Sequence, residues 1–359
     1  MELLSCMKRV VCGLCGLLSL CVLGVACDGL IYEDEGDCSV TYRVRFRYDW
    51  NMKFADAFAS EVESVTLYLL DGSGNIVWQR TEQGEALASE EYAMTVDVAP
   101  GTYDLLAWAG TTDKGSFPIA ADAATREELT CTLQRTCDAA GNAEVRGDID
   151  RLYHGYLAGQ TFGEEEGVHT YTLSLKKDTN NVRVVLQQLS GEQMDPERFT
   201  FAITAENGAM DWDNELLPDQ LLTYYAWHTQ SGVAGIESDD PNYISSLSAV
   251  IAELTTARLT VRDRMAPLAA GAAEEAFPEA NKMRLKVTDN QTGRTVVSVP
   301  LVDYALLVKG EYRKTMDDQE FLDRMDEYSL IFVLDDQLRW VSMSVNIHSW
   351  KLVMQNTSL

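Results

Sequence analysis

An apolar stretch that ends at a cysteine is the first feature of this chain with recognisable chemistry. The segment VVCGLCGLLSLCVLGVAC runs from Val10 to Cys27 and follows Lys8 and Arg9, the positive start typical of an export signal. Its length lies at the lower limit for a membrane-spanning helix. Ala26 places a small residue directly before Cys27, as lipoprotein processing requires, so the thiol would carry acyl chains after export.

Other outcomes of processing stay open. Gly24 stands three residues before Cys27, where lipoprotein signals usually carry leucine, and Gly24-Val25-Ala26 also fits ordinary signal peptidase. Plain secretion and an uncleaved anchor are the alternatives. We expect residues 1–26 to be a lipoprotein signal peptide and Cys27 to be the site of lipidation.

The sequence contains no recognisable catalytic or metal-binding motif. Its four histidines are scattered: His154, His169, His228 and His348. A calcium loop starting at Asp49 is rejected, because Phe54 and Ser60 replace the glycine and glutamate of an EF-hand. No nucleophile elbow or phosphate-binding loop occurs. Acidic residues are so common that chance carboxylate pairs do not indicate a glycosidase. We expect no enzyme, no cofactor and no bound metal.

Aromatic side chains are the other residues that could bind a ligand. The chain has seven tryptophans. Trp108 and Trp340 lie in expected strands, where core packing is the usual fate. Trp227 lies in LLTYYAWHT, between two expected strands. We therefore select Trp227 as the candidate for stacking against a ligand.

Charge and cysteine content restrict the partners. The formal net charge is −27, which excludes the broad basic surface that nucleic-acid binding needs. Outside the signal, the cysteines are Cys27, Cys38, Cys131 and Cys137. With Cys27 acylated, the other three cannot all pair, so this chain is not a disulfide scaffold. Cys131 and Cys137 either pair across a short turn or remain thiols.

Alternation of apolar and polar residues indicates a chain made mostly of β-strands. In CSVTYRVRFRY, residues 38–48, aromatic and aliphatic side chains alternate with threonine and arginine. Only 302–308 and 317–327 look helical, and 209–247 and 262–280 look like loops. Further strands are expected at 62–71, 129–135, 169–177, 180–189, 197–208, 254–261, 282–289 and 294–301, with hairpins over 92–110 and 328–350.

The spacing of the turn signals is typical of β-sandwiches. We expect an all-β fold with short helices in its loops. The expected divisions are an acidic tether at 27–37, an N-terminal β-sandwich at 38–168 and a C-terminal β-sandwich at 169–359. Residues expected to face the first core are Val44, Phe46, Leu67, Leu69, Tyr103 and Leu105.

Stretches along nearly the whole mature chain resemble one family. In the first half these are VRFRYDWNMKFADAF, VESVTLYLLDGSGNIV and VAPGTYDLLAWAG. In the second half they are LKKDTNNVRVVLQ, NGAMDWDNELL, AELTTARL, VPLVDYALL and QEFLDRMDEYSLIFVLD. All are similar to segments of the FimB-type fimbrial anchor-subunit family, the minor-fimbrium anchoring group of the Bacteroidetes fimbrillin superfamily.

The resemblance implies two transthyretin-like Greek-key β-sandwiches and no enzymatic activity. It implies a surface-exposed lipoprotein of the cell outer membrane, held in the lipid through acylated Cys27. It places the protein at the base of a fimbrium, where it would bind the fimbrillin subunits of the shaft and anchor, terminate or set the length of the fimbrium. A tip or accessory adhesin that binds glycan or protein is the alternative.

The resemblance also raises the question of cleavage. Shaft subunits of the superfamily are thought to lose an N-terminal strand by cleavage after an arginine, which opens a groove for a neighbour's strand. Here Arg43, Arg45 and Arg47 lie in the strand 38–48, and cleavage there would release the protein from Cys27. We expect this strand to stay whole. The segment 328–359 then either contacts the shaft or only completes the second sandwich.

Overall fold

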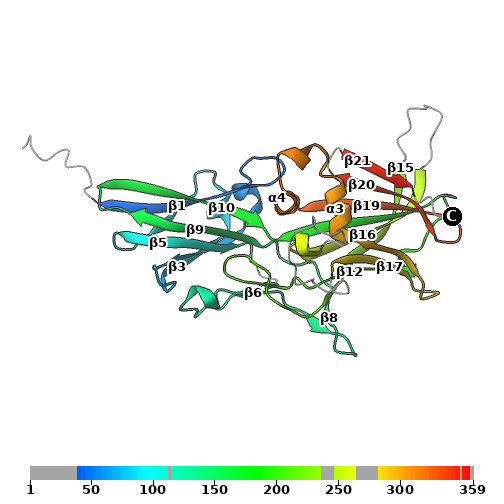
Figure 1. The fold of residues 1–359 in the computed structure, drawn as a ribbon, viewed down its shortest axis with the longest axis horizontal. Coiled ribbons are helices and arrows are strands. Elements are labelled where there is room, and N and C mark those ends of the chain that lie inside the picture. The colour runs from blue at the N-terminus through cyan, green and yellow to red at the C-terminus, as the bar shows by residue number, and fades with distance from the viewer. Residues whose placement is uncertain (1–38, 112–114, 236–245, 264–281, 348–349, 356–359) are drawn as a thin grey trace, which may run out of the picture.

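The computed structural model describes residues 39–111, 115–235, 246–263, 282–347 and 350–355. The molecule is elongated, with two β-rich units placed one after the other along its long axis (Figure 1). Strand β1 lies in one unit, and the last strands, β19 to β21, lie in the other. The all-β, two-sandwich architecture expected from the sequence is confirmed.

The first unit is one seven-stranded sheet that bends into two layers. Its order is β3-β2-β5-β9-β10-β1-β4. The β9–β10 ladder joins only His154 and Tyr153 to Lys176 and Lys177, so the sheet bends there. The strands are β1 (Val40–Trp50), β2 (Ser64–Leu70), β3 (Ile76–Gln83), β4 (Met94–Val96), β5 (Gly101–Ala109), β9 (Tyr153–Phe162) and β10 (Gly167–Lys177).

The period-two pattern of the first strand sorts its side chains as expected. Phe46 and Val44 are buried, while the intervening Arg45 is exposed. Val44 and Phe46 pack in one core cluster with Leu67 of β2 and Leu105 of β5. This cluster fills the space between the two layers. The expected inward residues Leu69, Leu67 and Leu105 are buried.

Tyr103 is the exception among the expected core residues. It is only half buried, and its hydroxyl donates to the carbonyl of Ala99 at 2.9 Å. Its ring packs against the edge of Phe162. The position near the start of β5, at the rim of the sandwich, leaves the polar end of the side chain in solvent.

The expected hairpin over 92–110 is wrong. β4 pairs with β1 in one layer, whereas β5 lies between β2 and β9 in the other. The turn at Pro100 and Gly101 therefore carries the chain across the sandwich instead of joining two neighbouring strands. Alternation identifies both strands, but it does not specify which strands pair.

The second unit contains two six-stranded sheets. The first has the order β15-β16-β11-β19-β20-β21, and the second has the order β18-β17-β12-β14-β8-β7. The first sheet comprises β11 (Thr179–Gln188), β15 (His228–Gly235), β16 (Ser246–Ala257), β19 (Glu327–Leu334), β20 (Trp340–Ile347) and β21 (Trp350–Gln355). The second comprises β7 (Thr136–Cys137), β8 (Ala143–Val145), β12 (Phe199–Ala205), β14 (Leu222–Tyr225), β17 (Arg284–Asp289) and β18 (Thr295–Pro300).

Short elements complete this unit. β6 (Cys131–Thr132) pairs with β13 (Ala209–Met210). Helices α3 (Leu301–Leu307) and α4 (Asp318–Arg324) lie where short helices were expected, and α2 (Phe58–Glu61) belongs to the first unit. Asp317 caps α4, because its carboxylate accepts from the backbone N–H of Glu320 at 2.7 Å.

Two expectations about the second unit need correction. The segment 209–247 was expected to be loop, yet it holds β13, β14, β15 and the start of β16. These strands are short or rich in small and polar residues, which weakens the apolar alternation that marks a strand. The strand expected at 254–261 is β16, which begins at Ser246 and ends at Ala257.

The expected border between residues 168 and 169 falls inside β10. That strand pairs with β1 and β9 of the first sheet until Lys177. β11 then starts the next sheet at Thr179. β6, β7 and β8 precede β10 in the sequence but pair with strands of the second unit. We propose to draw the border between the units at Asp178.

Candidate functional site

The strand that follows the tether is held on both sides. β1 runs parallel to β10 from the pair Val40–Gly167 to the pair Trp50–Lys176. It also runs antiparallel to β4. Its residue Arg45 donates to the carbonyl of Glu90 at 3.0 Å, on the outer face. The first strand therefore fills its own sheet and is continuous with the chain that leads back to Cys27, which lies outside the described residues.

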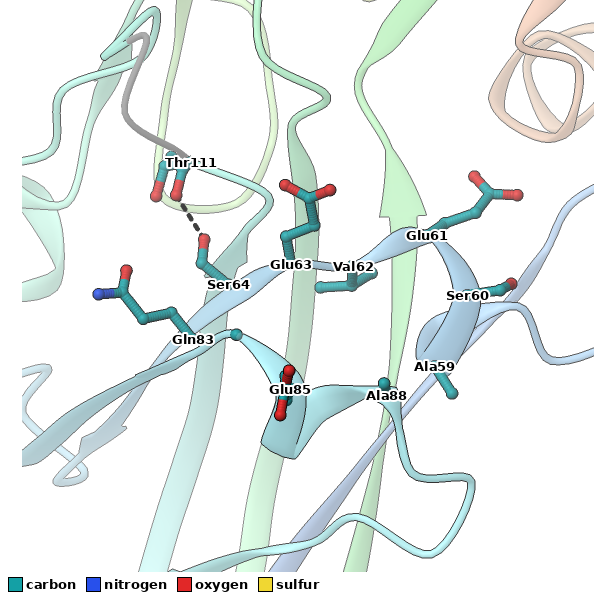
Figure 2. Close-up of a pocket in the computed structure, with 11 residues that line it drawn as sticks. Ala59, Ser60, Glu61, Val62, Glu63, Ser64, Gln83, Glu85, Ala88 and Thr111 are labelled. Carbon is teal, nitrogen blue, oxygen red and sulfur yellow. Dashed lines mark hydrogen bonds between the residues drawn. The ribbon is translucent and has the colours of Figure 1, made fainter.

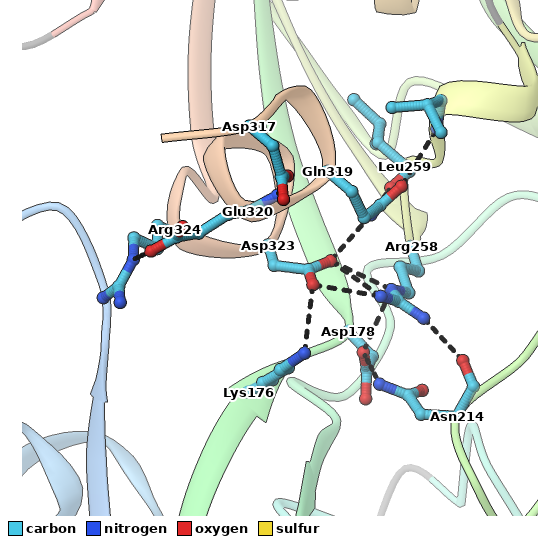
Figure 3. A network of polar contacts seen from close by, with 11 residues as sticks. Lys176, Asp178, Asn214, Arg258, Leu259, Asp317, Gln319, Glu320, Asp323 and Arg324 are labelled. Carbon is cyan, nitrogen blue, oxygen red and sulfur yellow. Dashed lines mark hydrogen bonds and ion pairs between the residues drawn. The ribbon is translucent and has the colours of Figure 1, made fainter. Parts of the chain in front are cut away.

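The two units are joined by a buried network of charges around Asp178 (Figure 3). The Arg258 guanidinium, at the end of β16, donates to both carboxylate oxygens of Asp323 on α4, at 2.8 and 3.0 Å. Lys176 of β10 reaches the same carboxylate at 3.3 Å. Arg258 and Asp323 are 8% and 6% exposed, so solvent screens this pair little.

Asp178 itself, the residue between β10 and β11, is fully buried. Its Oδ1 accepts from the side-chain amide of Asn214 at 2.8 Å and lies 3.8 Å from the Nε of Arg258. Its backbone N–H donates to the carbonyl of Leu152. Burial raises the pKa of Asp178 to about 7, and the nearby Arg258 opposes that rise. The single residue between β10 and β11 is thus fixed by contacts from both units.

A second set of contacts links the end of β1 to the second unit. Arg324 of α4 lies over the ring of Trp50, with its Cζ 4.5 Å from the centroid, and Lys176 lies 4.4 Å from the same centroid. Arg324 also donates to the carbonyl of Asp49 at 3.1 Å. These cation–π contacts and the hydrogen bond hold α4 against the first strand.

A buried histidine completes the junction. The ring nitrogen Nε2 of His154 lies 2.8 Å from the carbonyl oxygen of Trp212. Burial lowers the pKa of His154 to about 4, so the imidazole is neutral near pH 7 and its N–H donates to that carbonyl. The role of His154 here is packing and hydrogen bonding between the units.

Pocket residues in the first unit do not assemble a catalytic group. A pocket of about 520 Å³ is bordered by Glu61, Glu63 and Glu85, which Figure 2 shows around its mouth. The two serines beside it donate to backbone carbonyls: Ser60 to Ala57 at 3.0 Å and Ser64 to Thr111 at 2.5 Å. Since neither hydroxyl donates to a general base, this arrangement does not activate a nucleophile.

Among the residues that the structure describes, no three histidine, cysteine or acidic side chains are grouped to hold a metal. Cys131 is a buried thiol and Cys137 an exposed one; they do not form a disulfide. Within the same ranges, no helix has the length and apolar character needed to cross a bilayer.

Trp227, the candidate for ligand stacking, lies at a pocket on the first sheet of the second unit. Its side chain is 41% exposed. The pocket has a volume of about 580 Å³ and is also bordered by His228, Arg183 and Glu253. The residues of the charged junction, by contrast, were not selected from the sequence. A lone arginine or aspartate at the end of a strand looks like a solvated residue, and no local pattern marks it as buried.

These features define a class of protein: an elongated protein of two β-sandwiches in series, with a filled first sheet and a charged, buried junction. The chain belongs to the family of fimbrillin-A associated anchor proteins Mfa1 and Mfa2, whose profile matches residues 34–356. The sequence-based recognition of a fimbrial anchor family is thereby confirmed. No curated protein sequence matches the chain.

Solved structures of similar proteins share this fold. A protein from Bacteroides thetaiotaomicron described as a candidate adhesin is 31% identical, with a TM-score of 0.70, over 89% of this chain and 99% of its own. A second protein from that organism, described as a candidate polysaccharide-binding protein, is 28% identical, with a TM-score of 0.69, over 89% and 100%. The fimbrial anchor protein Mfa2 from Porphyromonas gingivalis shares the fold, with 16% identity and a TM-score of 0.58, over 88% and 99%. A fimbrial accessory role follows from the family.

Proposed function

We propose that this chain is an outer-membrane lipoprotein, tethered through acylated Cys27, that anchors a fimbrium and binds its shaft subunits. The observation that carries the proposal is the pairing of β1 with β10 and β4 along the strand that follows the tether. A subunit whose first sheet is already filled by its own strand offers no groove there for a neighbour. It can therefore end a chain of subunits while its N-terminus stays joined to lipid.

Membrane attachment is the first test of this proposal. Replacing Cys27 with Ala removes the thiol that would carry the lipid. Burial of acyl chains stabilises attachment by about 0.8 kcal/mol per CH₂ group, and stable anchoring needs more than one chain. We expect the C27A protein to leave the membrane fraction and to appear, with fimbriae, in the medium. An intact mass that shows an unmodified N-terminus in the native protein would refute the lipid anchor.

The shaft contact is assigned to the other end of the molecule. β21 is the last strand of its sheet and pairs with β20, from Ser342–Gln355 to Ile347–Trp350. Its other side pairs with none of the described strands. An open strand edge is suited to receive a strand from a partner. We propose that this edge, rather than the first sheet, contacts the shaft.

Deletion of residues 351–359 tests that contact. We expect both units to remain folded, because removal of an edge strand leaves the β19–β20 pairing in place, and we expect shedding of fimbriae into the medium to rise. The measurements are the melting temperature of the truncated protein and the amount of shed fimbriae. A lowered melting temperature with unchanged shedding would mean that β21 only completes the second sandwich.

The accessory-adhesin alternative has one observation in its favour, the exposed Trp227 in its pocket. The two Bacteroides relatives described as a candidate adhesin and a candidate polysaccharide-binding protein agree with it. Adhesion and anchoring would use different parts of the molecule: the pocket would bind a ligand, whereas Cys27 and β21 would hold the protein in the fimbrium. The two functions are compatible in one chain.

A further inference from the structure

The pocket at Trp227 is built on the outer face of four neighbouring strands. Arg183 of β11 is opposite Glu253 of β16 and Ser329 of β19, and Glu253 is opposite His228 of β15. The neighbours of Arg183 along its strand, Val182 and Val184, are buried, so Arg183 points outward. The register therefore places Ser329, Arg183, Glu253 and His228 in one row across the sheet, and all four border the pocket.

Trp227 stands beside this row with its polar atom satisfied from within the protein. The indole N–H donates to the hydroxyl of Thr255 at 3.1 Å, and that hydroxyl donates to Asp148 at 2.8 Å. The backbone N–H of Trp227 donates to the carbonyl of Glu253. These bonds fix the orientation of the ring. What the side chain presents to solvent is therefore an apolar, preoriented surface.

Each arginine at the pocket is paired with a carboxylate, and Glu327 also borders it. The Nε of Arg183 lies 2.6 Å from Oε1 of Glu253, and Nη1 of Arg151 lies 2.9 Å from Oδ1 of Asp148. The whole chain carries a formal net charge of −27. A pocket with paired charges on such an acidic protein does not attract an anion. The pocket still offers a hydrogen-bond donor next to an acceptor, since arginine only donates and carboxylate only accepts.

We propose that this pocket binds a neutral saccharide. A pyranose ring has one apolar C–H face, which would stack on Trp227, and a rim of hydroxyls that both donate and accept. Arg183 would donate to one hydroxyl and Glu253 would accept from a neighbouring one. An exposed aromatic beside a few fixed polar groups is the composition of a small-molecule site. This site goes beyond the anchoring role and does not depend on Cys27 or on β21.

The test uses the full chain and an array of immobilised neutral and sialylated oligosaccharides, followed by calorimetric titration of the neutral oligosaccharide that binds most strongly. We expect binding to neutral members. W227A should weaken it by about tenfold or more, equivalent to about 1.4 kcal/mol, whereas W227F keeps an aromatic face and should retain most of it. F54A is the matched control: Phe54 is an exposed aromatic, 56% accessible, outside this pocket, and its removal should leave binding unchanged.

The proposal would be overturned by no binding to any neutral oligosaccharide, by equal binding of W227A and the native protein, or by a preference for sialylated members. Equal losses in W227A and F54A would also do so, because they would show a general effect on the fold. Membrane attachment and shedding of fimbriae should be the same for W227A and the native protein. Failure of the saccharide site is thereby distinguished from failure of the anchoring role.

Discussion

Replacement of Arg258 with Ala is expected to lower the free energy of unfolding by about 3–5 kcal/mol, the usual cost of removing one partner from a buried ion pair. Asp323 and Asp178 would both lose the guanidinium, which lies 2.8 and 3.8 Å away in the native protein, and Lys176, 3.3 Å from Asp323, would be the cation left beside them. Both carboxylates are almost inaccessible to water, so solvent cannot replace the guanidinium. Urea denaturation followed by circular dichroism measures the change.

Arg183 provides the control for this experiment. Its distance to Glu253, 2.6 Å, is close to that between Arg258 and Asp323, but the Arg183 side chain is 57% exposed. Exposed pairs contribute about 0–1 kcal/mol, so R183A should change the stability by no more than that. If R258A and R183A lower the free energy of unfolding equally, burial of the charges is not what stabilises the junction.

The junction is also where a pulling force would pass from one unit to the other. If Cys27 is held in lipid and β21 contacts the shaft, tension runs through β10, Asp178 and β11. Strand ladders on both sides carry it by main-chain hydrogen bonds. The Lys176–Asp323 contact and the contact of Arg324 with Trp50 cross between the units and resist their separation at that point. Arg258 holds Asp323 in place for the first of these contacts. We accordingly expect R258A to unfold in two transitions rather than one.

The sequence predicts where the strands of this fold lie better than it predicts which strands pair. The alternation in 38–48 identifies β1 and its inward face, because one side of that strand is packed and the other faces solvent. The same logic fails for β4 and β5, which are strands but do not form a hairpin. Pairing depends on where the chain crosses between layers, and that is decided by tertiary packing.

The candidate site residues likewise differ in whether a local sequence pattern identifies them. Trp227 could be selected because it lies between two expected strands, and its pocket forms where strands from distant segments meet. Arg258, Asp178 and Asp323 could not, since long stretches of sequence separate them and no local pattern marks any of them as buried. A buried ion pair has no local sequence signal. It is recognised only when β16 and α4 are placed together.

Replacement of Phe46 with Ala is the second change with a large expected effect. The ring is 2% exposed and stacks on Phe58 and Tyr92, with centroid separations of 5.6 and 6.3 Å. Loss of a fully buried phenylalanine costs about 3–5 kcal/mol, because burial is lost and a cavity remains. R45A on the same strand is the control. Its side chain faces outward, so a change within about 0.5 kcal/mol is expected.

The effect of F46A should extend to the integrity of β1. Arg43 and Arg45 are exposed, but their peptide bonds are held in the ladder with β10, which protects them from a protease that cleaves after arginine. Cleavage then requires opening of the first unit, and the open population rises as its stability falls. We expect trypsin to cut β1 much faster in F46A than in R43A or the native protein. Equal rates would mean that the strand is accessible without unfolding, and a filled first sheet would no longer explain how the chain keeps its connection to Cys27.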